Sequence, residues 1–113
     1  MTIQHVIQEI HEREWLERHG VEEPSAERKR EGLFFFTSMC GTCKLAEKML
    51  EIAVSSGPVI PVSKININYS PVLRDRWEIT SVPCLVVLEN GKPVQIEYAM
   101  RSVVDMYTWL KLG

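Results

Sequence analysis

An apolar run of four residues, Leu33–Phe36, followed closely by a long amphipathic pattern, does most to constrain the fold of this chain. The run is short and aromatic, which is typical of a strand buried on both faces. Between residues 43 and 54, apolar side chains share one arc of a helix and charged side chains share the other. Residues 59–67 are rich in β-branched side chains and predict a second strand. The order strand, helix, strand predicts a right-handed crossover and a parallel strand pair.

Further elements follow this crossover. Residues 71–77 predict a short helix that opens on a proline, and Leu85–Leu88 is another buried strand. Asn90-Gly91 predicts a tight hairpin turn, and the alternation over residues 94–98 predicts an antiparallel partner strand. Ser102 and Asp105 have the spacing of a helix cap, so a last helix closes the chain.

The N-terminal part of the chain has a different pattern. Apolar residues recur there at helical spacing, at Ile3, Val6, Ile7 and Ile10. We therefore expect a first helix that continues toward Gly20. Residues 12–31 carry dense charge of both signs and predict a solvated helix end and a loop.

The sequence as a whole predicts an α/β fold of three layers, with a mixed four-stranded sheet flanked by helices. Residues 1–113 are expected to form a single domain, with a helix and charged loop in 1–32 and the core in 33–113.

The composition excludes several classes of function. A formal net charge of -2 over 113 residues gives no reason to expect a nucleic-acid partner. The first residues lack the basic and apolar segments of a secretion signal, and no apolar run approaches the ~20 residues that span a bilayer. The odd number of cysteines, three, fits a reducing compartment. We expect a cytoplasmic monomer with no membrane association and no cofactor.

The segment Cys40-Gly41-Thr42-Cys43 carries the chemistry of the chain. Its spacing alone fits both half of a zinc site and a redox dithiol. Its position favours the dithiol, because Cys40 lies between a strand and a helix, where the helix N-terminus stabilises a thiolate. Cys43 is one turn deeper, at the edge of the apolar arc. Cys40 is therefore expected to attack a substrate disulfide and Cys43 to release the mixed disulfide, while Gly41 keeps the turn open to a partner backbone.

This motif and three other segments together resemble the thioredoxin family. The matching segments are Phe34–Phe36 before the motif, Trp77–Pro83 and Leu88–Lys92, so the resemblance covers about two-thirds of the chain. It implies a thioredoxin-like fold and a protein-disulfide oxidoreductase, with protein disulfides as substrates and a thioredoxin reductase or a small thiol as electron donor. It also implies that the Val82-Pro83 peptide is cis, faces the dithiol and binds an extended substrate segment.

Several positions depart from the family pattern, and three of them bear on the chemistry. Met39 replaces the usual tryptophan before the first cysteine and offers a softer contact surface. Thr42 replaces the usual proline, which predicts a more oxidising couple. Phe34 replaces a buried acid, so Cys43 is expected to lose its proton less easily and reductase activity to be weaker. The residues expected to contact the substrate are Met39, Gly41, Thr42, Val82 and Pro83.

The third cysteine, Cys84, directly follows the proline of Val82-Pro83. It has two interpretations, a small buried core residue or an accessory thiol that exchanges with the pair. A metal-binding domain built on the three cysteines is a weaker alternative, and no metal site is predicted. A non-catalytic redox sensor or adaptor with the same fold is the main alternative to the enzyme.

Overall fold

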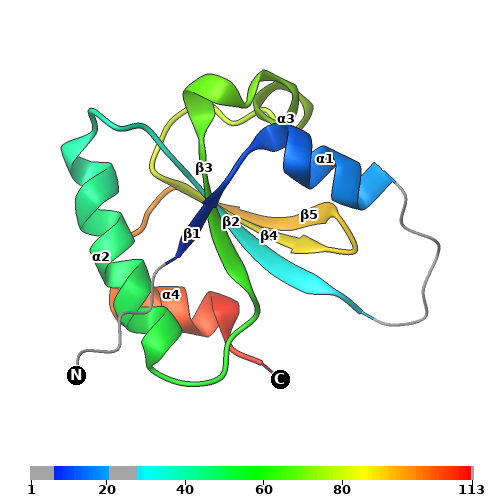
Figure 1. Cartoon of the computed structure of the whole chain (residues 1–113). Coiled ribbons are helices and arrows are strands. Elements are labelled where there is room, and N and C mark those ends of the chain that lie inside the picture. Colours follow the sequence, from blue (N-terminus) through cyan, green and yellow to red (C-terminus); the bar gives the residue numbers. More distant parts are fainter. Residues whose placement is uncertain (1–6, 21–27, 113) are drawn as a thin grey trace.

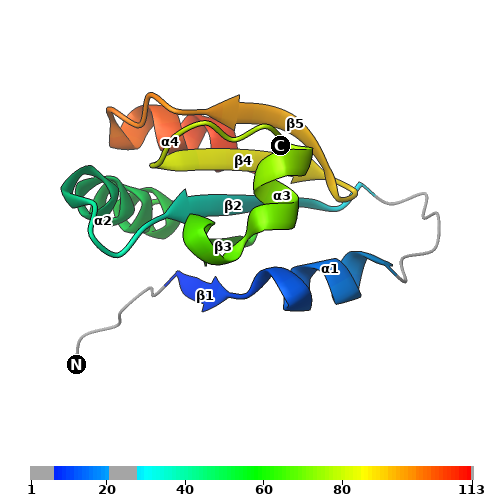
Figure 2. The same ribbon diagram turned by 90° about the horizontal axis from the view of Figure 1, so that it is seen from above.

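The computed structural model describes residues 7–20 and 28–112. These residues form one mixed sheet between two layers of helices (Figure 1). The strands lie in the order β1-β3-β2-β4-β5, which Figure 2 shows from β1 at the bottom to β5 at the top. Their bounds are β1 (Gln8–Ile10), β2 (Arg30–Phe36), β3 (Val62–Asn66), β4 (Cys84–Glu89) and β5 (Lys92–Glu97).

Helices cover both faces of the sheet. Figure 1 shows α2 and α4 on its lower left and α1 and α3 on its upper right. The helices are α1 (Glu12–Gly20), α2 (Gly41–Ser55), α3 (Pro71–Arg76) and α4 (Val103–Leu110), with a 3-10 turn η1 (Ile67–Tyr69) before α3. The predicted parallel strand pair is confirmed, because β2 and β3 pair in parallel and α2 joins them. The hairpin is confirmed too, since β4 runs antiparallel to both β2 and β5.

Alternating side chains of β2 divide the interior into two cores. Phe34 and Phe36 contribute to the α2–α4 core, which the two helices cover with the buried residues Cys43, Ala46, Leu50, Ala53, Met106 and Leu110. Leu33 and Phe35 contribute to the α1–α3 core, which contains Trp15, Leu73, Trp77, Cys84, Val86 and Leu88. The sheet separates the two cores, so the face on which a side chain lies decides which groups it can reach.

The prediction of a helix over Ile3–Ile10 was wrong for the part that the structure describes. Gln8–Ile10 is strand β1 and pairs in parallel with β3, while Met1–Val6 lie outside the described residues. Ile7 belongs to the α2–α4 core and Ile10 to the α1–α3 core. Two residues that are three positions apart lie on one face of a helix but on opposite faces of a strand.

The three-layer α/β prediction is confirmed, with a fifth strand added to the four expected.

Helix α1 is held to the domain by buried polar contacts rather than left as a solvated helix end. The Glu12 side chain is buried, and its Oε2 accepts a hydrogen bond from the backbone N–H of Leu73 at 2.6 Å, in the first turn of α3. Trp15 is buried as well and donates from Nε1 to Glu31 Oε1 at 3.1 Å. These contacts fix α1 beside α3 on one face of the sheet.

Among the described residues, no helix has the length and apolar character needed to span a membrane.

Candidate active site

Cys40 occupies the N-cap of α2, with extended backbone angles of φ -109° and ψ 112°. Its Sγ accepts a hydrogen bond from the backbone N–H of Cys43 at 3.1 Å and lies 3.1 Å from Thr42 Oγ1. Hydrogen bonds from Cys43, then from Thr42, lower the pKa of the Cys40 thiol below its ordinary 9.0. The positive end of the helix dipole acts in the same direction. Cys40 therefore presents a partly exposed sulfur that favours the thiolate, the form of a thiol that reacts with disulfides.

Cys43 has the opposite character. It is 2% exposed and forms part of the α2–α4 core. Burial, followed by the hydrogen bond to Cys40, raises the pKa of Cys43 to about 11. The motif thus holds an accessible sulfur that favours the thiolate and a sheltered sulfur that retains its proton. This asymmetry is what a two-step exchange requires.

The two thiols should separate clearly in an alkylation experiment. The thiolate fraction of each rises with pH, so Cys40 should reach half of its maximum rate below pH 9 and Cys43 only near pH 11. At pH 7 iodoacetamide should modify Cys40 at least ~10-fold faster, because the weaker nucleophilicity of a low-pKa thiolate offsets only part of the difference in ionisation. Peptide mass mapping over a pH series measures both rates. Equal rates at pH 7 would contradict the assigned asymmetry.

The residues predicted to contact the substrate surround Cys40 or lie close to the same core. Met39 is 96% exposed, and Gly41 has open space where a side chain would stand. Thr42 is exposed beside Cys40. The peptide bond between Val82 and Pro83 is cis, which confirms that expectation. Val82 and Cys40 both pack against the α2–α4 core, so this loop and the dithiol border one interior cluster.

Cys84 lies on the other side of the sheet. It is fully buried in the α1–α3 core and is the cross-strand partner of Phe35, whereas Cys43 belongs to the α2–α4 core. Burial raises the pKa of Cys84 to about 12. The sheet therefore stands between Cys84 and the dithiol, which favours the interpretation as a core residue. Within residues 7–20 and 28–112, no three His, Cys, Asp or Glu side chains are grouped to hold a metal ion.

Cys84 should accordingly stay reduced when the protein is mildly oxidised. We expect one disulfide, between Cys40 and Cys43, and a Cys84 thiol that is alkylated only after denaturant is added. Mass spectrometry of the alkylated peptides measures this. A disulfide between Cys84 and either other cysteine in the native protein would contradict the placement.

The structure also reveals an ion pair near Cys43 that the sequence did not single out. Glu47 Oε2 lies 2.7 Å from Lys64 Nζ, and Glu47 follows Cys43 by one helical turn. Lys64 is the cross-strand partner of Phe34, which is fully buried in the same core as Cys43. The sequence placed Glu47 among the charged residues of the outer helix arc. Its i, i+4 spacing from Cys43 was the one signal for this arrangement.

Comparisons with known proteins agree with this geometry. The thioredoxin family model matches residues 25–111. The thioredoxin-like protein YusE of Bacillus subtilis is 39% identical over 79 residues, which cover 70% of this chain and 74% of that protein. Thioredoxin of Chlamydia trachomatis is 31% identical over 68 residues, which cover 60% of this chain and 67% of the Chlamydia protein. The solved structure of a mutant thioredoxin from Halobacterium salinarum has the same fold, with a TM-score of 0.74 and 15% sequence identity. The match covers 97% of this chain and 92% of the chain in that structure.

Proposed function

This chain belongs to the thioredoxin family, and on that premise we propose that it is a thiol–disulfide oxidoreductase that exchanges protein disulfides through Cys40 and Cys43. The observation that carries the proposal is the asymmetry of the two thiols. Cys40 has a lowered pKa at the start of α2, and Cys43 has a pKa of about 11 in the core below it. An exposed thiolate is suited to attack a substrate disulfide, and a buried thiol beside it is suited to release the substrate from the mixed disulfide that forms.

The reaction takes place in two displacements. The Cys40 thiolate attacks one sulfur of a substrate disulfide, a Cys40–substrate disulfide forms, and the other substrate sulfur leaves as a thiolate. Cys43 then loses its proton and attacks Cys40 Sγ, which breaks the mixed disulfide and releases the second substrate thiol. The substrate is reduced by two electrons and the Cys40–Cys43 pair is oxidised to a disulfide. A thioredoxin reductase or a small thiol would supply the two electrons that restore the dithiol.

The substrate would bind around the exposed sulfur. We assign contacts to Met39, Gly41 and Thr42 beside Cys40, and to the backbone of Val82 and Pro83. Met39 is 96% exposed and flexible, which suits a surface that adapts to different protein partners. Gly41 leaves room for a partner backbone to approach the nucleophile.

Reduction of insulin disulfides with dithiothreitol as electron donor tests the proposal. The wild-type protein should accelerate insulin precipitation, and Cys40→Ser should not exceed the rate without protein. Turnover that survives in Cys40→Ser would overturn the assignment of the nucleophile.

One observation favours a redox sensor as the second candidate. Phe34 is fully buried in the same core as Cys43 and offers its thiol no base, which would slow the second displacement. A sensor would form the Cys40–Cys43 disulfide readily but would not turn over insulin. Titration of the dithiol against glutathione, run in parallel with the insulin assay, separates the two candidates.

A further inference from the structure

The second displacement needs an acceptor for the proton of Cys43. The Cys43 thiol is 2% exposed and has a pKa of about 11, so few molecules carry a thiolate there at neutral pH. Phe34 of β2 belongs to the same core and cannot accept a proton. The acceptor must therefore be another side chain that reaches the same core.

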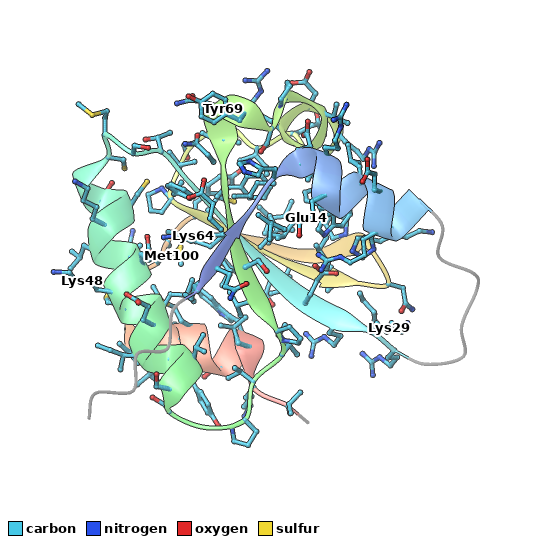
Figure 3. All side chains as sticks on the ribbon, viewed as in Figure 1. Glu14, Lys29, Lys48, Lys64, Tyr69 and Met100 are labelled. Carbon is cyan, nitrogen blue, oxygen red and sulfur yellow. The ribbon has the colours of Figure 1, made fainter. Side chains whose placement is uncertain are left out.

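The pair formed by Glu47 and Lys64 lies where such an acceptor is needed. Glu47 follows Cys43 by four residues on α2, so the Cβ atoms of the two lie about 5–6 Å apart on one helix face. Lys64 projects from β3 on the face that carries Phe34 and Phe36, with its Nζ 5.4 Å from the centre of the Phe36 ring. Figure 3 shows Lys64 between the sheet and α2, whereas Lys48 extends from the outer side of that helix.

The ion pair orients Glu47 toward the interior. Its 2.7 Å contact with Lys64 spans from helix to sheet, and the two side chains are only 24% and 20% exposed. The carboxylate is therefore held in the layer between α2 and the sheet rather than in bulk water. Its charge also raises the pKa of Cys43, after burial and the influence of Cys40, which places it within electrostatic reach of the thiol.

We propose that Glu47, positioned by Lys64, accepts the proton of Cys43 as Cys43 attacks the mixed disulfide, directly or through one water. The inference rests on the proposed function. The S–H bond of Cys43 breaks and its proton moves to the Glu47 carboxylate. The Cys43–Cys40 bond forms, the Cys40–substrate bond breaks with its electron pair on the substrate sulfur, and the proton then passes to that thiolate or to solvent. The groups that influence this proton are Cys40 at the N-cap of α2, the backbone of Thr37 and Glu47 on α2, and Glu47 is itself paired with Lys64 on β3. From α4, Tyr107 packs against the same core.

A carboxylate near a thiol has two opposite effects, and this makes the proposal testable. As a fixed negative charge it raises the pKa of Cys43 and disfavours the thiolate. As a base it removes the proton in the transition state and accelerates the step. Replacement by glutamine should therefore speed the second displacement if Glu47 acts only as a charge, and slow it if Glu47 accepts the proton.

The reaction of the reduced protein with 5,5′-dithiobis(2-nitrobenzoate) separates the two displacements. Attack by Cys40 releases one thionitrobenzoate, and attack by Cys43 on the resulting mixed disulfide releases a second. In Glu47→Gln we expect an unchanged first phase and a second phase slowed about tenfold or more at pH 7. The slowed phase should rise in proportion to hydroxide concentration, whereas the wild-type rate should depend less on pH.

Glu51→Gln is the matched control, because it makes the same charge change one turn further along α2 and should leave both phases at the wild-type rate. Glu47→Asp keeps the carboxylate and should recover part of the second phase. Unfolded molecules also expose the buried thiol of Cys84 and release a third thionitrobenzoate, so a total of two per chain identifies the folded protein. A second phase in Glu47→Gln that is equal to or faster than that of wild type would overturn the proposal. Absence of a second phase in the wild type would instead refute the proposed function.

Discussion

Cys43→Ser is expected to stop turnover after the first displacement and to leave the substrate covalently attached to Cys40. A serine hydroxyl has no accessible anion at neutral pH and cannot displace the substrate from Cys40 Sγ. Cys40 keeps its place at the N-cap of α2 and hence its reactivity, so the first displacement should proceed normally. When the reduced variant is mixed with insulin in the absence of dithiothreitol, non-reducing electrophoresis should show a stable complex that added dithiothreitol dissolves. In the assay with dithiothreitol, insulin reduction should fall far below the wild-type rate.

Cys84→Ala provides the control for this result. It also removes one of the three cysteines, but from the opposite core, so turnover should continue at a rate near that of the wild type. The Cys84→Ala substitution should lower the free energy of unfolding only slightly. Turnover in Cys43→Ser would show that an external thiol resolves the mixed disulfide and that Cys43 is dispensable.

Phe34→Asp is expected to lower the stability of the fold markedly while it accelerates the reaction of the molecules that remain folded. Phe34 is fully buried, and its ring stacks on that of Phe36 at a centroid distance of 6.4 Å. Loss of such a ring costs about 3–5 kcal/mol of the roughly 5–15 kcal/mol that stabilises a domain. The new carboxylate would lie next to Lys64 and on the same side of the sheet as Cys43, where it can accept the thiol proton. Urea unfolding measures the first effect, and insulin reduction per folded molecule measures the second.

Phe34→Asn is the matched variant, because it loses the same ring and buries a polar group of nearly the same shape without a base. It should be destabilised to a similar extent and should gain no rate. If Phe34→Asp reduces insulin no faster than the wild type, Phe34 does not account for slow deprotonation of Cys43.

Much of the arrangement around the dithiol follows from local patterns in the chain. The run Leu33–Phe36 and the amphipathic residues after Cys43 predicted β2 and α2, and hence the junction at which Cys40 lies. Asn90-Gly91 predicted the turn between β4 and β5, where Asn90 and Gly91 have positive φ angles of 52° and 79°. These features depend on residues within a few positions of one another, so their period and turn chemistry are visible in the sequence.

The N-terminal strand could not be predicted in the same way. The spacing of Ile7 and Ile10 satisfies a helical pattern, and three residues are too few for alternation to distinguish a strand. The pairing of β1 with β3 determined its conformation, as Gln8 and Ile10 lie opposite Ser63 and Ile65. The partner strand is more than fifty residues away, and neither segment carries a signal for the other.

The sequence by itself determined the strand–helix junction at Cys40, the motif that ends at Cys43 and the contrast in burial between the two cysteines, because backbone periodicity and the position of a residue at a helix end are local properties. Only the tertiary structure decided which face of the sheet each distant side chain occupies. That choice placed Cys84 in the opposite core and joined Glu47 of α2 to Lys64 of β3 beside the buried thiol. The physical reason is strand register: shifting the pairing by one residue moves a side chain to the other face, and register depends on contacts across the whole sheet.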